Sequence, residues 1–206
     1  MNSKKLVSLT FDDGPNTTTT MQVLDLIEQY GITASFFVIG NNINAESEAS
    51  MKRAVKLGCE IENHSRTHPA MPEMTAEEIA AEIKFTSDKV EAAVGRKPRF
   101  FRPPYIAYND VMFDTIDLTF ICGVGAEDYN DEITPEMRYE KIMSQVSDGT
   151  IILLHDAEGN FRTVEALKMI IPKLLDEGYE FVTVSKLFER NRLTPEHRTI
   201  YTNVHQ

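Results

Sequence analysis

The stretch LVSLTFDDGP (residues 6–15) predicts a buried β-strand that ends in a turn, because β-branched and aromatic residues are followed by Asp, Gly and Pro. Similar strand-like runs follow at residues 33–39, 59–63, 99–102, 119–124, 150–154 and 180–184. Amphipathic segments typical of helices lie between them, at residues 21–30, 46–57, 76–94, 109–116, 135–146 and 164–177. This strict alternation predicts an α/β fold with a mainly parallel sheet covered by helices.

Capping residues support these helix boundaries. Thr75 is a predicted N-cap with Glu78 as its capping-box partner, and Thr134 stands before Pro135 at the start of another helix. Glycines that could close helices in the left-handed conformation are Gly31, Gly58, Gly95, Gly149 and Gly178. About seven strand–helix units fit a distorted or incomplete (β/α)7–8 barrel better than an open doubly wound sheet, although the pattern is compatible with both.

The composition excludes several classes of protein. The chain has 206 residues, of which 42% are hydrophobic and 26% charged, the balance of an ordinary globular domain. Its formal net charge of −11 argues against nucleic acid or another polyanion as a partner. It contains no run of about 18 apolar residues, so we expect no membrane-spanning helix. No secretory signal is visible at the start of the sequence.

No linker or repeat divides the sequence. We therefore expect a single domain over residues 1–191, followed by a tail or linker over residues 192–206. Cys59 and Cys122 could form one bridge, two buried thiols or a reactive thiol, and their apolar surroundings favour buried thiols.

Two pairs of ionisable residues follow the first and third predicted strands. Asp12 and Asp13 are adjacent carboxylates that would repel each other in one pocket, and a cation held by one of them would relieve the repulsion. His64 and His68 have the i, i+4 spacing that lets two imidazoles reach one ion. Taken alone, the first pair could be a plain turn and the second two surface histidines.

Further polar residues follow the fourth and sixth predicted strands. Arg102 offers a fork of donors suited to a carboxylate, and the Pro-Pro pair before Tyr105 stiffens the chain. His155 stands where a general acid or base could lie, although a capping role would explain it as well. The carboxyl ends of parallel strands lie together at one end of such a fold, so we expect all these residues to share one site.

Four motifs in this order resemble the polysaccharide deacetylase family, also known as the NodB-homology or carbohydrate esterase family 4, which includes acetylxylan esterases. They are TFDDGP at residues 10–15, HSRTH at 64–68, RPPY at 102–105 and LLHD at 153–156. The resemblance implies a distorted β/α barrel that hydrolyses acetyl groups on xylan, chitin or peptidoglycan with a divalent metal. It also implies an extracellular enzyme, with other modules of a larger secreted protein as partners.

Roles for individual residues follow from the resemblance. It makes Asp13, His64 and His68 the metal ligands. It makes Asp12 the general base, oriented by Arg102, and implies that the Tyr105 backbone N–H helps to stabilise the oxyanion. It makes His155 the general acid, with Asp156 nearby. The ion would be zinc or cobalt, with nickel or manganese also compatible with two imidazoles and a carboxylate.

The sequence departs from the family pattern at two places. The stretch GAEDY at residues 125–129 puts Gly125 and Tyr129 where the family often has Asp and Trp. Unless another acid substitutes, His155 would lose its carboxylate partner and have a lowered pKa, which would favour ester over amide hydrolysis and hence O-acetylated xylan as substrate. Ile106 stands where Gly is common and would change the contact with substrate.

Two alternatives remain open at this point. One is an N-deacetylase of chitooligosaccharide or peptidoglycan, which would use the same residues on an amide. The other is a carbohydrate-binding barrel without catalysis. The complete set of Asp12, Asp13, His64, His68 and His155 argues against the second, because binding alone needs no spare base beside a metal.

Overall fold

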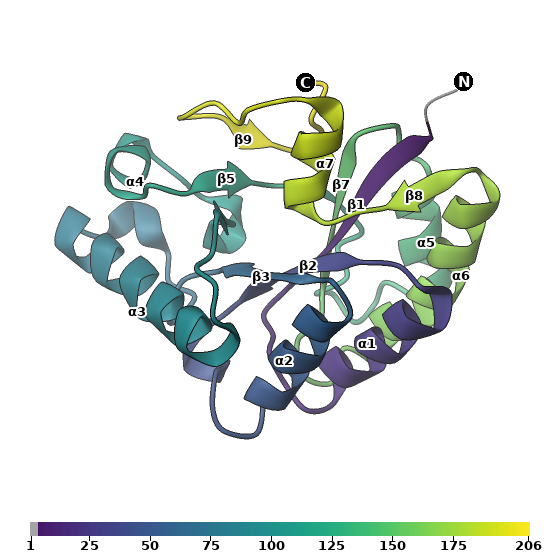
Figure 1. Ribbon diagram of the computed structural model, residues 1–206, viewed down its shortest axis with the longest axis horizontal. Coiled ribbons are helices and arrows are strands. Elements are labelled where there is room, and N and C mark those ends of the chain that lie inside the picture. Colours follow the sequence, from purple (N-terminus) through teal and green to yellow (C-terminus); the bar gives the residue numbers. More distant parts are fainter. Residues whose placement is uncertain (1–3) are drawn as a thin grey trace.

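The computed structural model describes residues 4–206 as one curled parallel sheet with helices packed around its outside (Figure 1). The strands in this range are β1 (Lys5–Asp12), β2 (Ala34–Val38), β3 (Glu60–Asn63), β4 (Phe100–Phe101), β5 (Thr119–Ile121), β6 (Val124–Gly125), β7 (Thr150–His155), β8 (Tyr179–Phe181) and β9 (Ile200–Tyr201). The α-helices in this range are α1 (Thr19–Tyr30), α2 (Glu48–Lys56), α3 (Ala76–Val94), α4 (Asp110–Thr115), α5 (Pro135–Met143), α6 (Phe161–Asp176) and α7 (Val184–Asn191).

The strand order confirms the predicted distorted barrel. Hydrogen-bonded neighbours follow the order β6-β7-β1-β2-β3-β4-β5-β9, and β8 pairs with the beginning of β1. β5 pairs with β4, whereas β6, which follows β5 after two residues, pairs with β7. This short stretch therefore connects the two sides of the curled sheet.

One predicted strand, at residues 119–124, is split into β5 and β6 at Gly123. A Cβ at this position would lie 2.8 Å from the Leu153 Cβ and 3.0 Å from the Ile151 carbonyl oxygen, so β7 passes too closely for any side chain. The strand bends here and changes its pairing partner.

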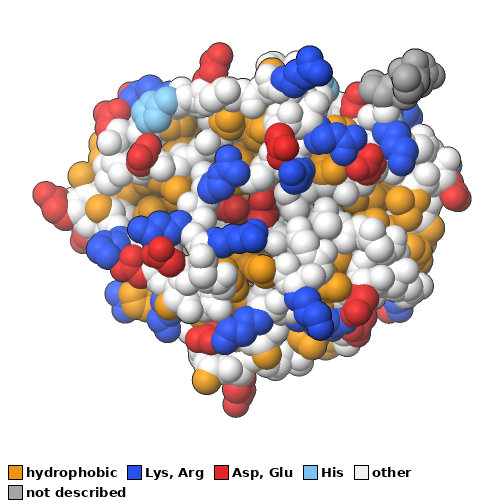
Figure 2. Space-filling model, in the orientation of Figure 1, with side chains coloured by type: hydrophobic (Ala, Val, Ile, Leu, Met, Phe, Trp, Pro, Cys, Tyr) orange, Lys and Arg blue, Asp and Glu red, His pale blue; other side chains and the backbone are white. Residues whose placement is uncertain are grey.

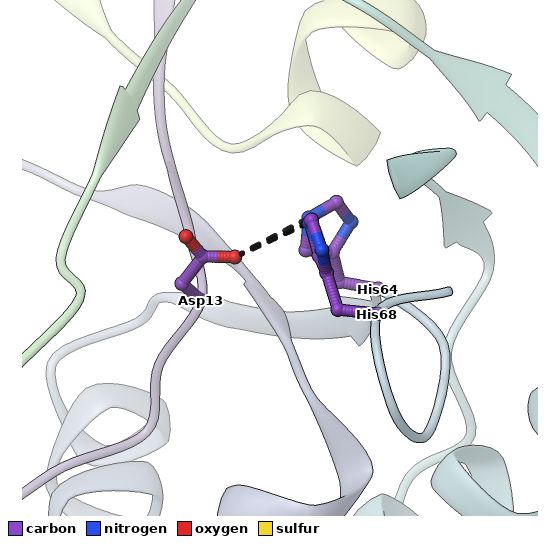
Figure 3. Close-up of side chains that lie close together, drawn as sticks. All are labelled: Asp13, His64 and His68. Carbon is purple, nitrogen blue, oxygen red and sulfur yellow. Dashed lines mark ion pairs between the residues drawn. The ribbon is translucent and has the colours of Figure 1, made fainter. Parts of the chain in front are cut away.

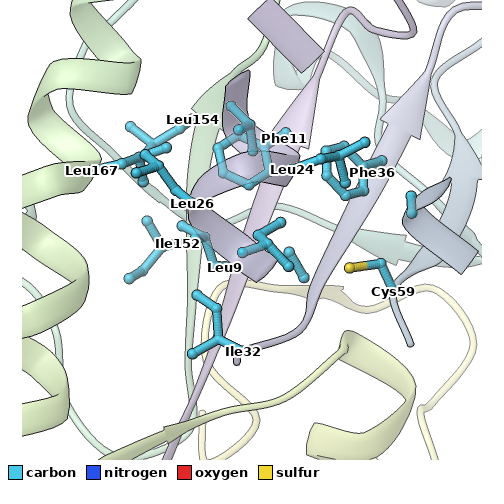
Figure 4. Close-up of a cluster of buried hydrophobic side chains, with 14 of the residues drawn as sticks. Leu9, Phe11, Leu24, Leu26, Ile32, Phe36, Cys59, Ile152, Leu154 and Leu167 are labelled. Carbon is cyan, nitrogen blue, oxygen red and sulfur yellow. The ribbon is translucent and has the colours of Figure 1, made fainter. Parts of the chain in front are cut away.

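The larger hydrophobic core lies between the sheet and the helices. Every second residue of β1 faces this layer, as expected for a strand with one face toward the helices: Val7, Leu9 and Phe11. Figure 4 shows part of the layer, to which β7, α1 and α6 also contribute: Leu9, Phe11, Leu24, Leu26, Ile32, Phe36, Cys59, Ile152, Leu154 and Leu167.

The alternate residues of β1 face the inside of the barrel, and their character changes along the strand. Leu6 belongs to a second apolar cluster that includes Phe37, Phe100 and Ile151. Toward the carboxyl end the inward-facing residues are Thr10 and Asp12, both buried. Polar side chains are therefore held in the barrel at the end of β1 where the predicted site lies.

Several helix ends form as predicted. Thr75 and Glu78 make a complete capping box at the start of α3, and the Thr134 side chain caps α5. Gly31 and Gly95 close α1 and α3 with left-handed φ values of 62° and 73°. The expectation for Gly149 was wrong, because α5 ends at Met143 and this glycine lies in the turn before β7.

Residues 192–206 are not a tail or linker, which corrects our expectation. Within them β9 pairs with β5, the Cys122 N–H donates to the Tyr201 carbonyl (2.8 Å) and the Ile151 N–H donates to the Thr202 carbonyl (3.0 Å). The segment thus lies between β5 and β7 and belongs to the barrel. The preceding helix α7 was also missed from the sequence.

We expect Tyr201→Ala to destabilise the protein by about 3 kcal/mol, because it removes a buried aromatic ring. The Tyr201 ring packs edge-on against Phe188, with centroids 4.9 Å apart. The free energy of unfolding, measured in urea, gives the size of the loss. Leu193→Ala, at an exposed position of the same segment, is the control and should change it by less than about 0.5 kcal/mol. Equal effects of the two variants would contradict the role assigned to β9.

The charged surface is mixed in sign. Figure 2 shows Lys and Arg side chains interspersed with Asp and Glu over the face drawn. The net charge of −11 therefore does not produce a uniformly acidic surface on that face. Among the helices formed by residues 4–206, none is both long and apolar enough to cross a membrane.

Candidate active site

The predicted site residues converge at the carboxyl end of the barrel. They line a cavity of about 750 Å³ that receives residues from the ends of β1, β3, β4, β6 and β7. The lining is Asp12, Asp13, His64, His68, Pro103, Tyr105, Ile106, Cys122, Gly123, Gly125, Glu127, Asp128, Tyr129, Leu153 and His155. Arg102 lies beneath this surface and is fully buried.

Asp13, His64 and His68 form a compact group of potential metal ligands. The Nε2 atoms of His64 and His68 lie 3.5 Å and 3.7 Å from Asp13 Oδ1. Figure 3 shows the Asp13 carboxylate, from the loop after β1, pointing toward the two imidazoles that follow β3. One ligand atom from each residue lies within 4.8 Å of the other two.

The donor set fits a divalent cation. Asp13 Oδ1 is buried and has no hydrogen-bond partner among residues 4–206, whereas buried polar atoms in proteins are normally paired. Two ligand atoms at about 2.1 Å from one ion in tetrahedral geometry are about 3.4 Å apart, close to the observed spacing. A cation among the three side chains would satisfy the unpaired oxygen.

The backbone around the group orients the imidazoles. His64 Nδ1 lies 2.7 Å from the Arg102 carbonyl oxygen, to which it donates a proton, so its Nε2 lone pair faces Asp13. Burial lowers the pKa of His64, which favours the neutral form that binds metals. The His68 N–H donates to Ser65 Oγ (3.0 Å), and His68 itself has a φ of 58°.

Asp12 is held in a different way from Asp13. Arg102 Nη1 donates to Asp12 Oδ1 at 2.5 Å, and Asp12 Oδ2 lies 3.8 Å from His64 Nε2. The Arg102 guanidinium also donates to Thr10 Oγ1 (2.8 Å) and stacks 4.2 Å over the Phe37 ring. The structure thus places a fixed carboxylate beside the ligand group, as the sequence predicted.

Two neighbouring residues on the cavity rim have unusual backbone conformations. Tyr105 and Ile106 have φ values of 58° and 54°, which are costly for a β-branched residue such as Ile106. The Tyr105 ring is 70% exposed and stands edge-on to His68, with centroids 4.6 Å apart. Ile106 lines the cavity as predicted, and the strain indicates that packing around it fixes this loop.

His155 has an acidic partner, because Asp128 substitutes for the carboxylate that is missing at Gly125, so the lowered pKa expected in the absence of such a substitute does not apply. Asp128 Oδ1 lies 2.8 Å from His155 Nδ1, and Asp128 Oδ2 accepts the His155 backbone N–H at 2.8 Å. Burial alone would lower the pKa of His155, but the hydrogen bond and charge of Asp128 outweigh it and raise the pKa to about 9. His155 is therefore protonated at neutral pH, with Nε2 left to face the cavity.

A buried network that the sequence did not reveal holds Asp128. Thr163 Oγ1 donates to Asp128 Oδ2 (2.7 Å), and Arg138 donates to both Thr163 Oγ1 (2.8 Å) and the Asn160 side-chain oxygen (2.7 Å). Burial opposes ionisation, yet the hydrogen bond and charge of His155 lower the pKa of Asp128. Asp128 therefore stays charged and fixes the imidazole orientation.

Asp156 does not reach the cavity, although the motif places it next to His155. Its carboxylate contacts the Thr20 hydroxyl and accepts the Gly14 N–H (3.2 Å). Burial, together with the charges of Asp13 and Asp12, raises its pKa to about 7. Asp156 thus supports the turn that carries Asp13.

The cysteines form no bridge and differ in their surroundings. Cys59 is buried, and burial raises the pKa of its thiol to about 11, so it behaves as a core residue. Cys122 is half-buried and lines the cavity, unlike the buried thiol that we expected.

We expect Asp128→Asn to shift the alkaline limb of the kcat profile downward by about 2.5 pH units or more. A general acid works while protonated, so wild-type kcat should fall only as the pH rises through about 9. Without the carboxylate, the pKa of His155 should return to about 6.5 or below. The measurement is kcat between pH 5 and 10, with the exposed Asp131→Asn as control. Superimposable kcat profiles of the wild type and Asp128→Asn would contradict the role of Asp128 in raising the pKa of His155.

Comparison with known proteins agrees with this geometry. The sequence pattern of the family described as polysaccharide deacetylase matches residues 1–134. A bifunctional xylanase/deacetylase from Pseudobutyrivibrio xylanivorans is 44% identical over 98% of the chain and 34% of its own length. The peptidoglycan-N-acetylmuramic acid deacetylase PdaC from Bacillus subtilis is 38% identical over 91% of the chain and 39% of its own length. The chain therefore spans little more than a third of these relatives.

A solved structure covers the whole domain. The family 4 acetyl xylan esterase from Clostridium thermocellum, in complex with a cobalt ion, is 39% identical, with a TM-score of 0.95 over 98% of this chain and 100% of that one. The fold and the motif resemblance are both confirmed, and the chain belongs to the polysaccharide deacetylase family, carbohydrate esterase family 4.

Proposed function

We propose that this domain hydrolyses acetyl esters on a neutral polysaccharide, with O-acetylated xylan as the favoured substrate. The observation that carries the proposal is the arrangement around one cavity of three metal-ligating side chains, a buried carboxylate and a protonated imidazole. A hydrolase that attacks an acetyl group with water needs a base for the nucleophile and an acid for the leaving group.

Asp13, His64 and His68 would hold the divalent cation. When bound, the cation supplies Lewis-acid chemistry: it lowers the pKa of water and polarises the acetyl carbonyl. The ligand types suit zinc or cobalt, and nickel or manganese remain compatible.

Asp12 acts as the general base. Its Oδ1 accepts from Arg102, which leaves Oδ2 to take the proton from water as the oxygen bonds to the acetyl carbon. Tyr105 lines the cavity, and its backbone N–H would stabilise the oxyanion that develops. Arg102 keeps the base oriented between turnovers.

His155 acts as the general acid. As the bond between the acetyl carbon and the sugar oxygen breaks, Nε2 donates its proton to that oxygen, and acetate and a free hydroxyl leave. Asp128 holds the opposite nitrogen at 2.8 Å and keeps the imidazole charged until transfer. The exposed rings of Tyr105 and Tyr129 stand beside His68 and His155 and can pack against the sugar.

Similarity to a xylanase/deacetylase and to an acetyl xylan esterase supports xylan as the substrate. The test is acetate release from acetylated xylan and from chitopentaose by one preparation, with zinc, cobalt, nickel and manganese each added. We expect the higher kcat/KM on acetylated xylan. Faster acetate release from chitopentaose would overturn the assignment of acetylated xylan as the substrate. No acetate release from any glycan would favour a carbohydrate-binding protein without catalysis.

The alternative is N-deacetylation of a chitooligosaccharide or peptidoglycan. The observation that favours it is the Asp128–His155 pair, because an amine leaving group depends strongly on a protonated acid and the pKa of His155 is about 9. PdaC, whose name records an N-acetylmuramic acid substrate, is a relative of this chain. Because His155 keeps a carboxylate partner, its environment does not by itself favour esters over amides.

We also propose that the domain works outside the cell beside other modules. A polymeric substrate supports an extracellular location, and the bifunctional xylanase/deacetylase, of which this chain covers 34%, supports additional modules. Fractionation of the native organism's culture, with deacetylase activity assayed in cells and medium, tests the location.

A further inference from the structure

A second pocket adjoins the catalytic cavity on the side of α2. It has a volume of about 580 Å³, within the range of small-molecule sites, and it shares Asp13 and His68 with the cavity. Its other walls come from the loops after β1, β2 and β7: Pro15, Asn16, Thr17, Ile39, Asn41, Asn42, Asn44, Glu46, Ser47, Ala157 and Glu158. The two hollows therefore meet at the predicted ligand group.

The two hollows differ in chemistry. The catalytic cavity is lined by Tyr105, Ile106, Tyr129 and Leu153, whereas amides, hydroxyls and carboxylates dominate the second pocket. Apart from the shared His68 imidazole, no aromatic, lysine or arginine side chain lines the second pocket within the described part of the chain. Such a surface suits the hydroxyl groups of a neutral sugar, and its acidic residues disfavour an anionic one.

Most of the polar groups in this pocket are committed to holding its loops. Asn16 Oδ1 accepts from the Thr18 and Thr20 N–H groups, and Asn42 Nδ2 donates to the Asp13 carbonyl (2.7 Å). Asn44 Oδ1 accepts from two backbone N–H groups at the start of the α2 region. These asparagines are occupied and cannot reach a ligand without loosening the loops.

Thr17 and Asn41 differ from these asparagines because each has a side-chain donor without a partner among the described residues. Both are exposed, and within residues 4–206 neither the Thr17 hydroxyl nor Asn41 Nδ2 has a hydrogen-bond partner, since Asn41 uses only Oδ1, toward Arg66 Nε (3.3 Å). Backbone hydrogen bonds hold the loops that carry them: the Ile39 N–H donates to the Gly14 carbonyl (2.9 Å) and the Asn41 N–H to the Arg66 carbonyl (3.0 Å). Thr17 and Asn41 therefore offer these donors on loops that line the same pocket as Asp13 and His68.

We propose that this pocket binds the sugar unit next to the acetylated one, through hydrogen bonds from Thr17 and Asn41 to its hydroxyl groups. This inference rests on the proposed function. A glycan that places its acetyl group in the catalytic cavity continues past Asp13 and His68 into the second pocket. Thr17 and Asn41 are therefore specificity-determining residues for chain length and for neutral character.

The test uses Thr17→Val combined with Asn41→Asp, which remove the donors at nearly constant size. The substrates are acetylated xylo-oligosaccharides of two to six units and p-nitrophenyl acetate, a small ester that fills only the catalytic cavity. Each lost hydrogen bond is expected to cost about 2- to 10-fold, so the ratio of kcat/KM on the hexamer to that on the small ester should fall about 4- to 100-fold. The loss should appear mainly in KM.

Matched changes at Thr194→Val and Asn191→Asp, which line neither hollow, should leave that ratio at the wild-type value. Thr17→Ser in place of Thr17→Val, combined with Asn41→Asp, should recover part of the lost ratio, because serine keeps the hydroxyl group. An unchanged ratio in the Thr17→Val and Asn41→Asp variant would overturn the subsite. If the wild type prefers N-acetylated chito-oligosaccharides, the xylan proposal fails, and the same variants on that series decide the subsite separately.

Discussion

Asp12→Asn is expected to lower kcat about 100- to 10,000-fold while metal binding is retained, because the change removes a general base and leaves all three ligands in place. Asn keeps an oxygen that can accept from Arg102 Nη1, which at present donates to Asp12 Oδ1. The measurements are kcat on acetylated xylan and the bound metal, determined by elemental analysis of the same sample.

Two controls separate loss of the base from loss of the fold. The exposed Asp117→Asn should leave kcat unchanged, and thermal unfolding of Asp12→Asn should remain cooperative. Near-normal deacetylation by Asp12→Asn would show that another group takes the proton. Loss of metal together with activity would instead place Asp12 among the ligands.

Asp13→Ala is expected to abolish metal binding and with it acetate release. A cation that binds only the folded wild type stabilises it by about 2.7 kcal/mol at a free concentration 100 times its Kd, so zinc or cobalt should raise the wild-type Tm. The variant should show no such rise, because the carboxylate that faces both imidazoles is gone. Differential scanning calorimetry with and without metal gives this result independently of activity.

The requirement for a cation can also be tested with the wild-type protein. Removal of metal by a chelator should abolish acetate release, and addition of zinc or cobalt should restore it. The Asp117→Ala control should respond to metal as the wild type does. Full activity of metal-free protein, or an equal Tm rise in Asp13→Ala, would disprove the cation requirement.

The residues nearest to the ligand group could be predicted from the sequence because they lie directly after strands. Asp13 follows β1 and His64 follows β3, and parallel pairing forces the ends of neighbouring strands to the same edge. Local sequence and topology are enough to bring such residues together. The same reasoning placed His155 at the end of β7.

Asp128 could not be found in this way. The stretch 125–129 offers two acids, and which one faces His155 depends on the turn after β6. Glu127 has a φ of 54° and turns outward to pair with Lys141 (3.2 Å), whereas Asp128 turns inward. The signal in the sequence was Asp128 itself, but only the backbone conformation shows where it points.

The last strand was missed for a different reason. β9 has two residues, too few to show an alternating pattern, and its stability comes from pairing with β5 far away in the sequence. Tyr201 and Val204 are buried in the apolar cluster inside the barrel, and this burial fixes the segment. Such tertiary contacts leave little trace in local sequence.

The loops that carry the ligand group differ from those that form the outer walls. The ligands follow β1 and β3, whereas Asn41 and Glu46 follow β2, and Ile106 follows β4. Directed evolution aimed at another glycan can therefore vary Asn41, Glu46 and Ile106, while Asn42, which donates to the Asp13 carbonyl, and Asn44, which holds the loop, are kept. Exchange of these loops between relatives offers a second route to new biomass-processing catalysts.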